Sequence, residues 1–222
     1  MYRLKISFLT LLLWSATACS QTAAPPSPSS PDTRKTSTPY KGDLSIFESP
    51  GRDERLQIDR VMDTLMITQG KHVADVGAGS GWFTVRAAKR VGDSGEVYAV
   101  DINPEAIRYI NDRIRKEQIR NVKTIQGRED NPLLPANQVD AVLHLKTYHE
   151  VAKPVTLLRN LRASLRPGAK VGIIDRNGNG TNHGIDRDVV LKEAAEAGYV
   201  LDGSYDFVKD NMDYFLVFSV KP

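Results

Sequence analysis

Residues 73–84 read VADVGAGSGWFT: a short apolar strand, a glycine-rich turn and the beginning of a helix. The turn has no side chains at Gly77, Gly79 and Gly81, so the backbone can bend sharply and a ligand can approach its amides closely. Strand, turn and helix together form one unit of an α/β fold. This unit predicts a ligand site at the carboxyl end of the strand.

The same alternation of strands and helices continues along the chain. Periodicity predicts helices over residues 52–67, 82–91, 153–165 and 186–197, a further helix from Asn103-Pro104, and strands over 72–76, 97–101, 122–126, 139–145, 170–175, 199–208 and 214–220. The last two strands are separated only by residues 209–213, which predicts a hairpin. We therefore expect a doubly wound, mostly parallel seven-stranded sheet with an antiparallel last strand and ligands at the carboxyl ends of its strands.

An acidic residue ends the second strand and defines the class of ligand more closely. Asp101 stands 24 residues after Gly77, where a carboxylate can accept hydrogen bonds from both hydroxyls of a ribose. A dinucleotide site has the glycine pattern G-x-G-x-x-G. This chain has Trp82 in place of the third glycine, which disfavours a nicotinamide-dependent oxidoreductase.

The string VADVGAGSGWFT resembles motif I of class I S-adenosylmethionine (SAM)-dependent methyltransferases, and AVDINPE at 99–105 resembles their second motif. The resemblance runs from about residue 56 to 222, through GREDNPLLP, VDAVLHLKTYHEV, LRPGAKVGIID and YFLVFSV. It implies the Rossmann-like methyltransferase fold, with SAM as the cofactor. It also implies that the methionine moiety is held by Asp75, Gly77, Ala78, Gly79 and Gly81. Asp101 would hold the ribose and Ile102 the adenine.

The resemblance places an acidic residue near the adenine amino group, in the loop after the third strand. Glu129 and Asp130 are the two possibilities, because Arg128 stands where many relatives have Asp. After the fourth strand, the polar group Tyr148, His149 and Glu150 is expected to face the substrate.

His149 is either a general base or a wall of the cofactor pocket, since its unperturbed pKa of about 6.5 suits proton removal from a hydroxyl. His144 is expected to be a hydrogen-bonded core histidine, and His183 lies on a polar loop that could cover the site. The sequence shows no His, Asp and Glu cluster with recognisable ligand spacing. It therefore predicts no metal site.

The N-terminal residues predict export. Arg3 and Lys5 precede an apolar run, and Ala16-Thr17-Ala18-Cys19 resembles the lipobox of bacterial lipoproteins, in which the cysteine is acylated. Residues 1–19 are thus expected to be a signal peptide with lipidation at Cys19, although cleavage after Ala18 or no cleavage stays open. Residues 20–42 are rich in Ser, Thr, Ala and Pro and predict a linker, with the domain at 43–222.

Composition limits the partners. The chain has 30 basic and 27 acidic residues, and without Arg3 and Lys5 the balance is 28 against 27, which is no nucleic-acid signature. We expect a methyltransferase that acts on a small-molecule acceptor and is lipid-anchored on the periplasmic side of a bacterial cell envelope. SAM is made in the cytoplasm, so two alternatives stay open: a cytoplasmic enzyme whose signal is unused, and a non-catalytic envelope protein that binds a nucleoside-like ligand. The oligomeric state is not predicted.

Overall fold

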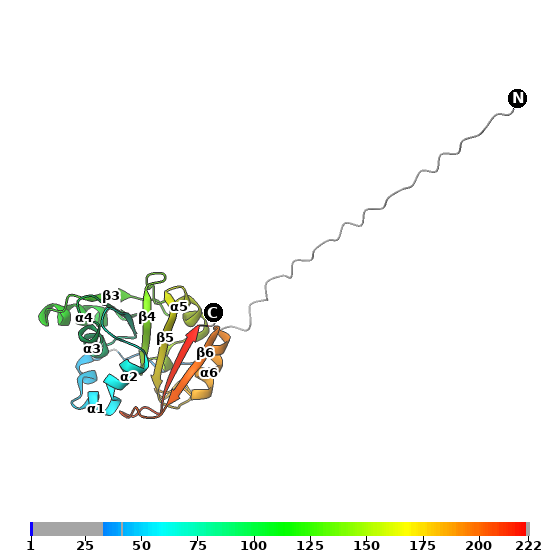
Figure 1. Ribbon diagram of the computed structural model, residues 1–222. Coiled ribbons are helices and arrows are strands. Elements are labelled where there is room, and N and C mark those ends of the chain that lie inside the picture. The colour runs from blue at the N-terminus through cyan, green and yellow to red at the C-terminus, as the bar shows by residue number, and fades with distance from the viewer. Residues whose placement is uncertain (2–32, 41, 221–222) are drawn as a thin grey trace. The chain divides into compact units, whose positions relative to one another are not determined.

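A single mixed sheet organises the structure, a computed structural model that describes Met1 and residues 33–40 and 42–220. The strands lie in the order β3-β2-β1-β4-β5-β7-β6 (Figure 1). Their bounds are β1 His72–Val76, β2 Glu96–Asp101, β3 Val122–Gln126, β4 Val139–Leu145, β5 Leu165–Asp175, β6 Tyr199–Tyr205 and β7 Tyr214–Val220. β1 pairs with β2 and β4 in parallel, whereas β7 runs antiparallel to β5 and β6. The predicted seven-stranded sheet with its antiparallel last strand is confirmed.

Helices cover both faces of the sheet. They are α1 Arg52–Leu56, α2 Ile58–Thr64, α3 Trp82–Val91, α4 Pro104–Lys116, α5 Pro154–Arg162 and α6 Arg187–Glu196, with short 3₁₀ helices η1 Leu44–Glu48 and η2 Tyr148–Glu150. Apolar residues of α1, α2 and α3 share one core with the strands, and those of α5 and α6 share a second core on the opposite face. This arrangement leaves the carboxyl ends of β1, β2, β4 and β5 free for loops that carry polar side chains.

The helix predicted over residues 52–67 is two helices. Gln57 adopts the left-handed conformation with φ of 48°, and its backbone N–H donates to the Glu54 carbonyl at 3.2 Å. The chain therefore turns between α1 and α2. The apolar spacing survives this turn because Leu56, Ile58 and Val61 all point into the same core.

Residues 34–40, which composition assigns to the linker, pack against the domain. The backbone N–H of Arg34 donates to the Ala152 carbonyl at 3.0 Å, and Ser37 is buried. Of the described residues, 33–40 and 42–220 belong to one compact unit. Packing against the domain thus begins before the predicted boundary at residue 43, because Arg34 and Ser37 form hydrogen bonds with it.

The predicted signal peptide and its Cys19 lie outside the described residues, apart from Met1. In the part of the chain that the structure describes, no helix has the length and apolar character needed to cross a membrane.

Candidate active site

A cavity of about 1000 Å³ opens at the carboxyl ends of β1, β2 and β4. Its walls come from the glycine turn after β1, the end of β2, the loop after β3, the η2 turn after β4 and the segment before α1. The lining includes Asp75, Gly77, Ala78, Gly79, Asp101, Ile102, Glu129, His149 and Glu150. Most of the site residues predicted from the sequence thus meet in one cavity.

The glycine turn has the close approach that its sequence predicts. Gly77 and Gly79 have φ of 79° and 55°, in the left-handed region that favours glycine. A Cβ at Gly77 would collide with the Thr147 side chain, and one at Gly79 would point at the Phe47 ring, 3.6 Å away. Gly81 does not line the cavity: it caps α3 with φ of 74°. Its contribution is to the shape of the turn.

Two carboxylates lie beside this turn. Asp101 accepts hydrogen bonds from the backbone N–H groups of Gly79 and Asn103, each at 2.9 Å, and burial raises its pKa. Asp75 is buried and accepts from the Thr84 hydroxyl at 2.6 Å. Burial raises the pKa of Asp75 to about 7, against the effect of the Thr84 hydrogen bond.

The residues expected around the adenine are only partly in place. Ile102 is 47% exposed at the cavity wall, which leaves its side chain available to a flat apolar ring. Glu129 lines the cavity, whereas Asp130 does not and instead lies 3.5 Å from the Lys153 ammonium. Of the two acidic candidates in this loop, Glu129 is the one that a ligand can reach.

His149 is held by a buried carboxylate that the sequence analysis did not single out. Asp175, at the end of β5, accepts from the backbone N–H of His149 at 3.0 Å and lies 2.9 Å from its Nδ1. A carboxylate accepts only, so Nδ1 carries a proton that it donates to Asp175, and in the neutral ring the lone pair is therefore on Nε2. The sequence feature that could have identified Asp175 as a site residue is its place at the end of a buried apolar strand.

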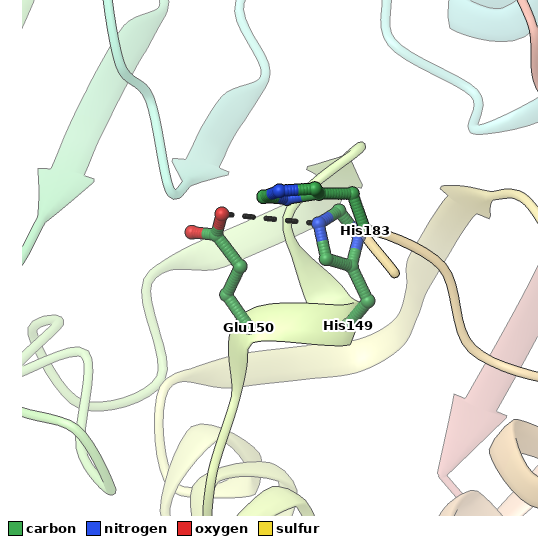
Figure 2. A group of neighbouring side chains, drawn as sticks. All are labelled: His149, Glu150 and His183. Atoms are coloured by element: carbon green, nitrogen blue, oxygen red, sulfur yellow. Dashed lines mark ion pairs between the residues drawn. The ribbon is translucent and has the colours of Figure 1, made fainter. Parts of the chain in front are cut away.

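The Nε2 side of His149 meets two further polar side chains. Figure 2 shows Glu150 from the same η2 turn and His183 from the loop after β5 beside His149. The two imidazole rings are 5.8 Å apart between centroids, with an interplanar angle of 88°. Glu150 Oε1 lies 3.8 Å from His149 Nε2, too far for a hydrogen bond. Burial raises the pKa of Glu150, and Asp101 and Asp175 raise it further against the lowering by His149.

These three residues form a cluster that the sequence spacing does not reveal. One ligand atom from each lies within 4.8 Å of the others. His183 follows His149 by 34 positions, so only the fold brings the two loops together. The expectation of no metal site rested on spacing along the chain and missed this group.

Tyr148, expected with His149 and Glu150 in the substrate group, faces away from the cavity. It is fully buried, its hydroxyl donates to Glu193 at 3.0 Å, and the Arg34 guanidinium lies 4.9 Å from its ring centroid. A 3₁₀ turn points successive side chains in different directions, so three adjacent polar residues do not share one face. Tyr148 is a packing residue, which corrects its assignment as catalytic.

Residues 73–168 match the model of a family described as "Methyltransferase domain". A SAM-dependent methyltransferase from Aquifex aeolicus aligns with a TM-score of 0.73 and 25% identity, over 82% of this chain and all of that one. The fold is that of a SAM-dependent methyltransferase. Fibrillarin from Aeropyrum pernix, solved with natively bound SAM, shares the fold at a TM-score of 0.53 and 17% identity, over 69% of this chain and 68% of that one.

Among curated proteins, the demethylmenaquinone methyltransferase of Geobacillus sp. (strain WCH70) is 31% identical over 110 residues, 50% of this chain and 47% of that protein. The chain thus spans about half the length of the curated relatives it matches. The comparisons support SAM as the cofactor of this domain.

The residues of the methyltransferase fold fit SAM on their own chemistry. Ser80, within the glycine turn, has a buried hydroxyl with no hydrogen-bond partner among the described residues, and both ring nitrogens of His144 are likewise unpartnered. Both residues line the cavity. Buried polar atoms without partners are costly, and a polar ligand would satisfy them. The expectation that His144 is hydrogen-bonded is wrong, because β4 buries it, and burial lowers its pKa to about 4.

Two parts of the cavity wall were missed by sequence reasoning. Arg52 is buried at the wall, with its guanidinium 4.4 Å from the Trp82 ring centroid and 3.2 Å from Asp210. Thr36, Pro39 and nearby residues of the N-terminal segment also line the cavity. The N-terminal segment was missed because its composition is typical of a linker. Arg52 was missed because its sequence position is that of an ordinary polar residue on an amphipathic helix.

Proposed function

We propose that this chain transfers a methyl group from SAM to a small-molecule acceptor. One observation carries the proposal: the glycine turn and Asp101, which suit SAM, line the same cavity as His149 and Glu150. A single cavity aligns the two reactants, and alignment alone supplies much of the rate of such a displacement. The balance of 28 basic against 27 acidic residues, without Arg3 and Lys5, disfavours a nucleic-acid acceptor.

Different residues of the cavity bind different parts of SAM in this proposal. The turn amides and Asp75 hold the methionine part of SAM, Asp101 the ribose, and Ile102 and Glu129 the adenine. The Arg52 guanidinium lines the same cavity, and although it is already paired with Asp210 at 3.2 Å, its positive charge suits the methionine carboxylate. Bound SAM supplies a methyl group on a positively charged sulfur.

His149 is the proton acceptor in this proposal. Asp175 fixes its tautomer, so that the Nε2 lone pair faces the cavity beside Glu150. An acceptor hydroxyl or thiol that loses its proton to Nε2 becomes a stronger nucleophile. Asp175 acts as a positioning residue.

Calorimetry of the full chain tests the cofactor. We expect binding of SAM and of its demethylated product, and no binding of NAD. A screen of phenols, thiols and amines with detection of the demethylated product then identifies acceptors. Tight SAM binding with no turnover on any acceptor would favour the alternative of a non-catalytic binding protein, and absence of SAM binding would refute the proposal.

Replacement of His149 tests its role. His149→Ala should lower turnover by about 10² to 10⁴-fold while SAM affinity holds. Loss of SAM affinity along with turnover would assign His149 to the pocket wall instead.

The location proposed for the protein is the periplasmic side of the bacterial envelope, with a lipid on Cys19. The order of Arg3, Lys5, the apolar run and Cys19 supports it. Native protein should fractionate with membranes and incorporate labelled fatty acid, and Cys19→Ala should abolish the labelling. Soluble protein with an intact Met1 would contradict export.

A further inference from the structure

We propose that His149, Glu150 and His183 form a binding site for one divalent transition-metal ion, with Zn²⁺ as its most suitable occupant. The three residues come from two loops that meet at the carboxyl ends of β4 and β5, and their ligand atoms lie within 4.8 Å of one another (Figure 2). Two imidazoles and one carboxylate are a recognised ligand set for this class of ion.

Asp175 prepares His149 for this role. Metal-binding histidines almost always donate the second ring N–H to a carboxylate, a carbonyl or water, which fixes the tautomer and the ring orientation. Here Nδ1 lies 2.9 Å and 3.0 Å from the two oxygens of Asp175, which is itself fully buried. The lone pair on Nε2 is therefore directed to the side where Glu150 lies.

The loop that carries His183 is fastened at the same place. The His183 backbone N–H donates to the Ser37 hydroxyl at 2.7 Å, and its carbonyl accepts from Arg176 Nε at 2.8 Å. Ser37 in turn donates to the Gly180 carbonyl at 3.1 Å. These contacts fix the His183 backbone, while its exposed imidazole touches the protein at the His149 ring.

The distances suit a small ion after a modest adjustment. Metal–ligand bonds of about 2.0 to 2.2 Å in tetrahedral geometry separate ligand atoms by about 3.3 to 3.6 Å, so the widest pair must close by about 1.5 Å at most. Rotation of the Glu150 and His183 side chains provides this movement. Mg²⁺ and Ca²⁺ prefer all-oxygen ligand sets, so two imidazoles select against them.

Three protein ligands leave a coordination position open to the cavity. Its use in catalysis rests on the proposed methyl transfer: an acceptor hydroxyl in this position would release its proton to water because coordination lowers its pKa. The oxygen lone pair then forms the O–CH₃ bond as the S–CH₃ bond of SAM breaks, and the thioether product leaves. The ion uses the Nε2 lone pair, so in the metal-loaded protein coordination replaces His149 as the cause of deprotonation.

Metal binding is tested on the full, untagged chain carrying Cys19→Ser, which removes its thiol. After treatment with a chelator and its removal, calorimetric titration with Zn²⁺ should show one site of micromolar or tighter affinity, and Zn²⁺ should raise the melting temperature. His183→Asn, which keeps a side chain that tolerates the left-handed φ of 55° at this position, and Glu150→Gln should each weaken binding at least tenfold. Asp175→Asn should weaken it by about 10 to 100-fold.

His72→Asn is the matched control, because His72 stands at the amino end of β1 and does not line the cavity. Its Zn²⁺ affinity should equal that of the parent protein. Absence of a micromolar site, or a site that His183→Asn and Glu150→Gln leave unchanged, would overturn the inference. SAM affinity is measured on the same samples, so loss of the metal site alone leaves the proposed methyl transfer standing.

Discussion

Replacing Asp101 with alanine separates the binding role of this carboxylate from its structural role. The side chain accepts from Gly79 N–H and Asn103 N–H at 2.9 Å each, and under our proposal it also accepts from the SAM ribose. Hydrogen bonds to a charged group contribute about 1.5 to 3 kcal/mol. Asp101→Ala should therefore weaken SAM binding by about 10 to 150-fold.

The same variant loses stability. Each amide left without a partner costs about 1 to 3 kcal/mol. Burial raises the pKa of Asp101, which means that it disfavours the charged carboxylate. Removing this carboxylate therefore offsets part of the cost. We expect the free energy of unfolding to fall by about 1 to 3 kcal/mol in denaturant titrations.

Asp186→Ala is the control for a general loss of stability. Asp186 caps α6 by accepting from the Asp188 N–H at 2.9 Å and does not line the cavity. Its loss should cost about 1 kcal/mol with SAM affinity unchanged in calorimetry. Asp101→Ala that binds SAM within twofold of wild type, although folded, would refute the ribose assignment.

Three further results are expected. Because burial raises the pKa of Asp75 to about 7, the native state keeps a proton that the unfolded chain releases near pH 4, so the Asp75 contribution to the free energy of unfolding falls as pH rises from about 4 to about 7. Cationic SAM favours the ionised form, so calorimetry in buffers of different ionisation enthalpy should show proton release at pH 6 and affinity rising to pH 8, both lost in Asp75→Asn. Gly79→Arg should abolish SAM binding with the fold retained in circular dichroism, because its side chain would project toward Phe47 inside the cavity; measurable binding would contradict this. Tyr148→Phe, which loses the 3.0 Å bond to Glu193, should lower the free energy of unfolding by about 1 kcal/mol and leave SAM affinity unchanged, whereas a drop in affinity would return Tyr148 to the site.

The local sequence determined the elements and the cofactor side of the cavity. Strand β1, its glycine turn and Asp101 are local patterns, because strand period, left-handed glycine and a carboxylate at a strand end each depend on near neighbours. Features that depend on near neighbours can be predicted from a single sequence. The order of helices and strands and the antiparallel β7 followed from the same patterns.

Only the tertiary structure brought His149, Asp175 and His183 together. His149 lies in the η2 turn after β4, Asp175 ends β5 and His183 lies in the loop after β5, so their meeting depends on how β4 and β5 pair. Residues 34–40 read as linker, yet Arg34 and Ser37 form hydrogen bonds with Ala152 and Gly180 of the domain. Tyr148 and His149 are adjacent in the chain, and the η2 turn sends one into the core and the other to the cavity. Contacts between distant residues form through packing of the whole sheet, and no spacing along the chain records them.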